Sequence, residues 1–260
     1  MSSVKAYIPV KSNRIHEVDF LRAIAFFAVV LQHVIGAYGS RPGIKLDESV
    51  FLGLVFVLSK FAVPMFVFLS GMSLFYTYSQ GLKIGEFFRK RVKSILLPYI
   101  AWTLFYSYFA RFGLPHSGDF SLVASRFAEH GFMAEVLRNL TFGVSYYHMW
   151  FVVMIFQFYL LFPLLLRLSR WIMGFSSPKL NSRVLFGINL VWIVLLAVKT
   201  YVLPLISLPV QNNEVFQFLM AWSDREFIFY FGYFTLGAQA GLGVDKWRAW
   251  IKNLPTGVWV

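Results

Sequence analysis

Residues 14–38 read RIHEVDFLRAIAFFAVVLQHVIGAY, and this stretch decides the fold because it is mostly apolar from Phe20 to Tyr38. A helix needs ~20 mostly apolar residues to cross the ~30 Å hydrocarbon core of a bilayer, since it rises ~1.5 Å per residue. The run is long for the apolar region of a signal peptide, and no clear small-x-small cleavage site follows it. We therefore interpret it as a retained first transmembrane helix.

The composition of the whole chain fits a membrane protein better than a soluble one. Of its 260 residues, 58% are hydrophobic and only 14% are charged, whereas a soluble domain is about half apolar and a quarter charged. A soluble domain of this size could not bury the 30 phenylalanines in one core. The absence of cysteine excludes a disulfide framework, a thiolate zinc site and a cysteine nucleophile.

Five further apolar runs approach or exceed the spanning length, and none of them alternates as the strands of a transmembrane barrel do. We predict an all-α, polytopic transmembrane helix bundle that forms one integral membrane domain over residues 1–260. About six spans are expected, at 20–39, 51–79, 95–112, 146–166, 184–208 and 226–244.

The basic residues predict a cytoplasmic N-terminus. With that orientation, the segments on the cytoplasmic side carry 15 of the 24 Lys and Arg residues and the outer segments carry 6. The net charge of +12 is therefore assigned to topology and anionic lipid, with no nucleic-acid partner. The long outer segment 113–145 is expected to hold a short helix at 121–140. The final LPTGVWV, residues 254–260, looks like an approach to a further span, so we expect the chain to be incomplete at its C-terminus.

Three polar side chains of the first span are candidates for catalysis. Arg22 and His33 are 11 positions apart, so on a helix they face within roughly 20° of each other and ~16 Å apart along the axis. Asp19 can pair with Arg22 at the i,i+3 spacing. Charged groups inside a span are functional candidates, and a neutral imidazole can act as a general base. The structural alternative is that Arg22 reaches the headgroups while His33 hydrogen-bonds a neighbouring helix.

Other candidates lie in the next spans. Pro64 is expected to bend the second run, near a possible extra turn before Lys60, and Ser70-Gly71 permits close helix approach. Lys60 either reaches outward or meets an anionic substrate. Basic residues before the third span can hold phosphates or merely set topology. They are Arg89, Lys90, Arg91 and Lys93.

His148 and Trp150 open the fourth expected span beside Tyr146 and Tyr147. An aromatic belt at the membrane interface explains most of this pattern, and a contact with an exported substrate is the alternative. The sequence contains neither a P-loop motif nor HExxH, and no metal site is expected.

Five stretches in order resemble acyltransferase family 3, the membrane acyltransferases that modify surface glycans. They are EVDFLRAIAFFAVVLQH, KFAVPMFVFLSG, FFRKRVKSILLPYIAW, HMWFVVMIFQFYLLFP and FYFGYFTLGA. The family's pattern of Arg, ten residues and His falls on Arg22 and His33. Its paired arginines, spaced by three, are not reproduced here, where the stretch reads Arg91, Val92, Lys93, Ser94.

The resemblance implies an enzyme of the bacterial inner membrane that transfers an acyl group other than an aminoacyl group. It implies acyl-CoA, as acetyl- or succinyl-CoA, as a donor substrate with no permanently bound cofactor, and His33 as the essential base. Arg22 would contact the donor or the fold, and the basic cluster would hold donor phosphates. The acceptor would be a lipid-linked or exported glycan, with polysaccharide synthases as further partners. SILLPYIAW is closest to members that act on polysaccharides such as poly-N-acetylglucosamine.

Two other functions fit the same residues. The chain could be a glycan export or flippase component that uses its aromatic-lined spans without an acyl donor. Alternatively, a chain with six spans, where the family usually has about ten, could be a non-catalytic partner. Transfer of labelled acyl groups from acyl-CoA separates these possibilities.

Overall fold

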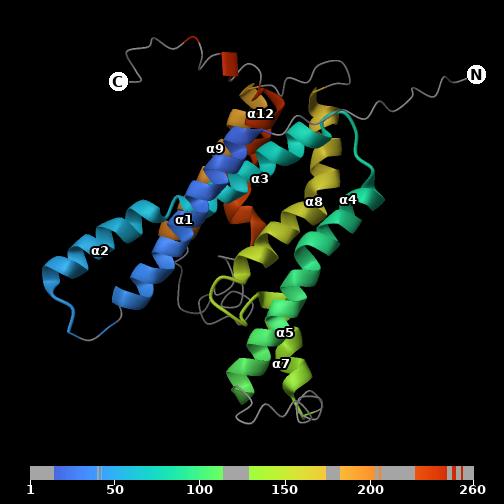
Figure 1. The fold of residues 1–260 in the computed structure, drawn as a ribbon. Helices are drawn as coiled ribbons and strands as arrows, with labels where there is room; N and C mark the ends of the chain where they lie inside the picture. The colour runs from blue at the N-terminus through green and yellow to red at the C-terminus, as the bar shows by residue number, and fades with distance from the viewer. Residues whose placement is uncertain are drawn as a thin grey trace, which may run out of the picture. The chain divides into compact units, whose positions relative to one another are not determined.

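The computed structural model describes residues 15–39, 41, 43–113, 129–173, 182–202, 205, 226–244, 248–249 and 253. Within these residues the chain forms helices and no strand, which confirms the all-α class. The principal elements are α1 (His16–Gly39), α2 (Leu46–Ser59), α3 (Ala62–Tyr78), α4 (Ile84–Arg91), the π-helical turn η1 (Val92–Leu96), α5 (Leu97–Phe112), α7 (Phe132–Phe142), α8 (Trp150–Met173), α9 (Ser182–Ala197), the π-helical turn η2 (Val198–Val202), the 3-10 turn η5 (Phe227–Tyr230) and α12 (Phe231–Leu242) (Figure 1).

Three helical stretches of the described residues are long and apolar enough to cross a membrane: His16–Gly39, Leu46–Tyr78 and Trp150–Ser169. A shorter apolar helix covers Gly187–Val202. Large apolar side chains on α1 remain exposed, including Phe20 at 67% and Phe27 at 71%. Lipid tails can cover such side chains where water would penalise them. The six spans and the cytoplasmic N-terminus stay predictions.

The chain divides into two compact units, and each is described by itself. The first comprises Met1–Gly81, Ser169–Val191 and Tyr230–Val260. The second comprises Leu82–Leu168 and Trp192–Phe229. Residues 254–260, which we expected to approach a further span, lie outside the described residues.

The second apolar run is divided into α2 and α3 by a turn at Lys60 and Phe61. Pro64 is the third residue of α3, in the first turn, where a residue without a backbone N–H removes no intrahelical hydrogen bond. The carbonyl of Ser59, at the end of α2, accepts a hydrogen bond from the Gln32 side chain of α1. The interruption expected near Lys60 and Pro64 is therefore present, and α1 supports it.

Glycines allow α3 and α12 to cross at very short range in the first unit (Figure 1). A Cβ built on Gly237 would fall far inside the van der Waals contact distance of the Phe68 carbonyl oxygen. The same holds for Gly241 against the Met72 carbonyl and for Gly71 against the Phe234 carbonyl. These positions form a small-residue interface of the kind that lets transmembrane helices approach closely. The close approach expected at Gly71 is confirmed.

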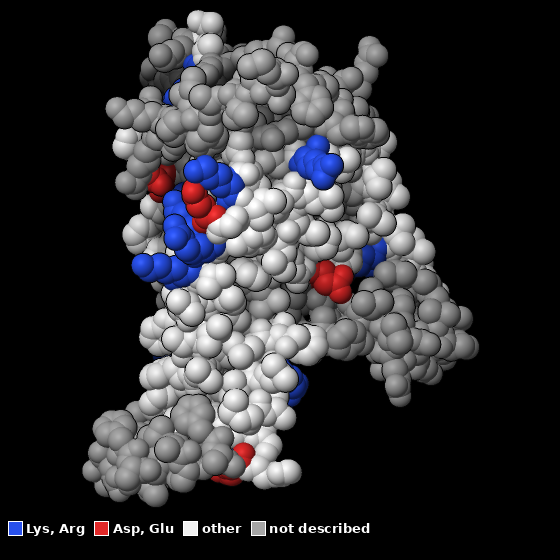
Figure 2. All heavy atoms as spheres, turned by 90° about the vertical axis from the view of Figure 1, so that its right-hand side faces the viewer, with Lys and Arg blue, Asp and Glu red and all other residues white. Residues whose placement is uncertain are grey.

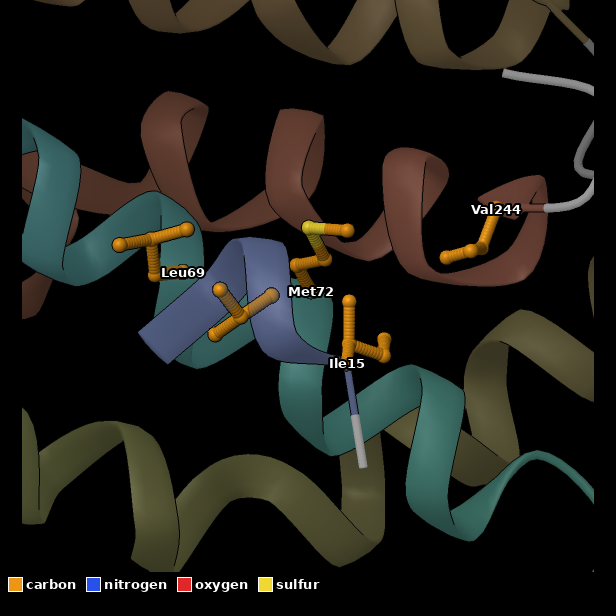
Figure 3. Close-up of a cluster of buried hydrophobic side chains, with 5 residues drawn as sticks. Ile15, Leu69, Met72 and Val244 are labelled. Carbon is orange, nitrogen blue, oxygen red and sulfur yellow. The ribbon is translucent and has the colours of Figure 1, made fainter. Parts of the chain in front are cut away.

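A hydrophobic cluster lies at one end of this helix crossing. Figure 3 shows side chains from the start of α1, from α3 and from the residues after α12 gathered together. The cluster consists of Ile15, Val18, Leu69, Met72 and Val244. Because each is at most 8% exposed, the cluster fixes the beginning of α1 against α3.

The second unit contains a helical hairpin of α5 and α7 with its own small core of Tyr108, Phe132 and Val136 (Figure 1). Asn139 donates a hydrogen bond of 2.9 Å to the buried Ser107 hydroxyl. Arg111 forms ion pairs of 2.9 Å with both Glu129 and Glu135 at the other end of the hairpin. The short helix expected at 121–140 is observed as α7, from Phe132 to Phe142, and residues 121–128 lie outside the described part.

The segment from α4 to α5 is continuous, and the π-helical turn η1 lies within it. The Leu97 N–H donates to the Val92 carbonyl, which is the wider five-residue spacing of a π turn. Pro98 follows in the first turn of α5. A proline ring clashes with the carbonyl four residues earlier in a regular helix, so the wider turn gives the backbone room to continue.

Candidate active site

Arg22 is held between its own helix and α3. Its Nη2 donates a hydrogen bond of 2.8 Å to the Ser73 hydroxyl, and its Nη1 lies 3.6 Å from Asp19 Oδ1. The Arg22 and Asp19 side chains are 41% and 36% exposed, so solvent or headgroups still reach the pair. The i,i+3 pairing expected from the sequence is confirmed, and Arg22 also contacts the fold through Ser73.

His33 lies further along the same uninterrupted helix. Since α1 has no break between Arg22 and His33, their side chains leave the helix within roughly 20° of each other and ~16 Å apart along the axis. His33 is half-buried. The preceding residue, Gln32, contacts Ser59, whereas Arg22 contacts Ser73, so α1 runs antiparallel to the α2–α3 segment. The side of α1 that carries Arg22 thus contacts this segment through Ser73, and a catalytic role for Arg22 or His33 stays a prediction.

Lys60 lies in the turn that Gln32 supports from α1. Its side chain is exposed, and its Nζ lies 5.3 Å from the centre of the Phe56 ring. A cation over an aromatic face at this distance is stabilised by the ring quadrupole. Lys60 is therefore in the same unit as His33, beside a residue that α1 contacts, and its expected role in substrate binding stays a prediction.

The basic cluster lies in the second unit and has one ordered member. Arg89, Lys90 and Lys93 are exposed. The Arg91 guanidinium instead lies 4.7 Å from the Phe87 ring centre and 5.0 Å from the Tyr159 ring centre. Its Nε is buried and has no hydrogen-bond partner among the described residues. The cluster thus combines three surface cations with one arginine fixed between two aromatic rings.

Ser94 does not replace the missing arginine of the family pattern. Its hydroxyl donates a hydrogen bond of 2.7 Å to the Lys90 carbonyl of its own helix. Figure 2 shows one group of Lys and Arg side chains with acidic side chains among them, and separate charged side chains elsewhere on the same face.

Sequence reasoning identified His148 and Trp150 but missed the α5 residues that lie beside them. His148 contacts Tyr106 edge-on at 6.1 Å between ring centres, and Tyr106 stacks on Tyr146 at 4.6 Å. Trp102 stacks on Tyr106 from the preceding turn. The aromatic spacing of four between Trp102 and Tyr106 was a usable signal, because such residues lie on one helix face.

Partial desolvation of His148 beside these rings lowers the pKa of its imidazole. The residue lies two positions before the candidate span that begins at Trp150. Trp150 is half-buried and contacts Phe151 edge-on. Among the residues that the structure describes, no group of three or more His, Asp or Glu side chains is arranged to hold a metal ion.

Comparison with known proteins assigns a family to nearly the whole chain. The family model of acyltransferase family 3, described as an acyltransferase domain, matches residues 15–258. No curated protein and no solved structure matches the chain. The match covers Arg22, His33, the basic cluster and the aromatic residues around His148.

Proposed function

The chain belongs to acyltransferase family 3, and on that premise we propose that it moves an acetyl or succinyl group from acyl-CoA to a glycan hydroxyl. The acceptor is a cell-surface glycan or exopolysaccharide, and the protein works in the bacterial inner membrane. Membership of an acyltransferase family and the apolar helices support the coarser statement that the protein is a membrane acyltransferase. The donor, the acceptor and the compartment are the proposed part.

The observation that carries the proposal is the line formed by Arg22 and His33 on one side of α1. Asp19 and Ser73 hold the arginine, so the positive charge has a defined place along the helix. A cation near one end and an imidazole ~16 Å further along suit a donor with an anionic head and a reactive end deeper in the bilayer.

The reaction assigned to His33 is general-base catalysis. The imidazole takes the proton of the acceptor hydroxyl while the oxygen attacks the thioester carbonyl. A carbon–oxygen bond forms, the carbon–sulfur bond breaks, and the CoA thiolate leaves and recovers the proton from the imidazolium. The products are the acyl ester of the glycan and free CoA. This assignment requires His33 to be neutral before the reaction.

The basic cluster is assigned to the CoA end of the donor. Phosphate oxygens are strong acceptors for guanidinium and ammonium groups. The Arg91 guanidinium is already ordered by two rings, which reduces the entropy lost on binding. We assign Lys60, His148 and Trp150 to binding of the substrate. Acyl-CoA is consumed in the reaction and is therefore a substrate.

The test is transfer of a labelled acyl group from acyl-CoA to glycan in membranes that contain the full chain. A general base typically contributes ~10²–10⁴ in rate, so we expect His33→Ala to lose at least ~100-fold in transfer while membrane insertion is unchanged. His16→Ala on the same helix is the matched control and should retain transfer.

Full transfer by His33→Ala would remove the proposed mechanism. Glycan export that depends on the wild-type chain, without any transfer of labelled acyl groups, would instead identify an export component.

A further inference from the structure

Four aromatic rings form a continuous series of contacts in the second unit, two of them stacked and one tilted, which we call the aromatic shelf. It consists of Trp102 and Tyr106 on α5 and Tyr146 and Tyr147 in the turn before α8. Successive ring centres are 5.7, 4.6 and 4.4 Å apart, and the interplanar angles are 28°, 15° and 37°. Two separate chain segments therefore build one ordered aromatic surface.

The rings at both ends of the shelf are exposed. Trp102 is 52% exposed and Tyr147 is 56% exposed, although each has a ring stacked on one side. His148 contacts Tyr146 and Tyr147 in edge-to-face geometry, with ring centres 5.2 and 5.5 Å apart. Each end of the shelf is therefore available to a flat ligand that can lie on an aromatic ring.

The backbone beneath the shelf is fixed. Gly143 ends α7 in the left-handed conformation at φ +65°, and a Cβ there would lie 2.7 Å from the Trp150 Cα. The Tyr99 hydroxyl donates a hydrogen bond of 2.7 Å to the Leu140 carbonyl. These contacts pack the end of α7 against α5 and against the first residue of α8, so the tyrosines of the intervening turn are presented from a rigid base.

The chemistry of the shelf favours a neutral, partly polar ligand. The rings carry no formal charge, and partial desolvation lowers the pKa of His148, which favours the neutral imidazole. An anionic headgroup would find no cation within the shelf itself.

We propose that the aromatic shelf binds neutral sugar rings of the acceptor glycan, with one ring stacked at Trp102 and another at Tyr147. Sugar C–H bonds present a slightly positive face to the negative face of an aromatic ring, and sugar hydroxyls can bond the tyrosine hydroxyls and His148. This inference rests on the proposed function, because it names the kind of acceptor that the enzyme holds. An interfacial belt needs only rings at headgroup depth, and it does not require rings from two segments to stack into one series.

The test is binding of two neutral probes, an N-acetylglucosamine tetrasaccharide and maltotetraose, to the full chain in neutral-lipid nanodiscs without an acyl donor. Saturation-transfer NMR titrations give the Kd and identify the sugar protons that lie on the rings. We expect Trp102→Leu and Tyr147→Leu each to weaken binding of at least one probe about five- to tenfold, the range of one aromatic contact. Tyr147→Phe should stay within about twofold of wild type because it keeps the ring.

Tyr201→Leu is the matched control, since Tyr201 belongs to the same unit, is 72% exposed and lies outside the shelf. Because binding is measured without an acyl donor, loss of sugar binding in the leucine variants is distinguishable from loss of acyl transfer in His33→Ala. Unchanged binding by both leucine variants, or no binding of either tetrasaccharide to wild type, overturns the proposal. A weaker yield of inserted protein with an unchanged Kd would identify the rings as interface anchors and would also overturn it.

Discussion

Replacing Gly237 by alanine tests the crossing of α3 and α12 directly. The added methyl group would meet the Phe68 carbonyl oxygen, and Gly241 places the Met72 carbonyl against α12 one turn later. Neither obstacle is the end of a flexible side chain. The two helix backbones must therefore separate before the methyl group reaches the ~3.5–4.0 Å at which nonbonded atoms attract.

The expected effect on stability follows from two opposing contributions. Alanine is favoured over glycine in a helix interior by ~1 kcal/mol. Overpacking in a well-packed interface costs typically ~1–3 kcal/mol, and we take the upper end because the obstacle at Gly237 is backbone. The net loss is therefore about 2 kcal/mol, or roughly thirtyfold in the ratio of folded to unfolded protein.

The measurement is reversible unfolding of the full chain in mixed micelles, with helicity followed as the fraction of denaturing detergent rises. Gly53→Ala on α2 is the matched control, because no atom lies within 4 Å of the Cβ built there. We expect Gly53→Ala to be neutral or more stable by up to ~1 kcal/mol. If Gly237→Ala unfolds at the same detergent fraction as Gly53→Ala, the close crossing of these helices is refuted.

Two further predictions concern the second unit. Arg91→Lys keeps the charge but loses the planar stacking on Tyr159, so KM for acyl-CoA should rise about fivefold, as loss of one cation–π contact implies. Lys83→Arg, outside the basic cluster, is the control and should leave KM unchanged. An unaltered KM in Arg91→Lys would contradict the assignment. The pKa of His148 is lowered in the folded protein, so the folded state binds fewer protons than the unfolded state near this pKa. The free energy of unfolding should therefore fall as the pH drops from 7 through the ordinary histidine pKa of ~6.5. His148→Phe should flatten this decline in detergent unfolding between pH 7 and 5, and identical pH profiles would disprove it.

The sequence predicted the helices and their class because apolar length and composition determine them locally. The run at 14–38 forms α1 without a break between Arg22 and His33. The angle and the axial distance between these two residues could therefore be predicted from helix geometry. The division near Lys60 was also predictable, since proline restricts the helix around it. These conclusions need only the covalent chain and the bilayer as a solvent.

The contacts between helices were not predictable in the same way. Ser73 as the partner of Arg22, and the Ser59 carbonyl as the partner of Gln32, depend on how α1 lies against α3. That arrangement follows from close packing at positions far apart in the sequence. The stacking of Tyr106 on Tyr146 similarly required the fold of the turn after Gly143, whose positive φ has no signature beyond the glycine itself.

The π turn at Val92–Leu96 changes how the surface of its helix must be read. A helical wheel at 100° per residue from Arg91 to Trp102 misplaces the residues after the π turn. The π turn contains one more residue than an α-helical turn, so the wheel must leave one residue out there. Aligned relatives that lack one residue in this stretch would keep the direction of both the cations and the aromatic rings. A gap of one at this place is therefore compatible with an unchanged face on either side of it.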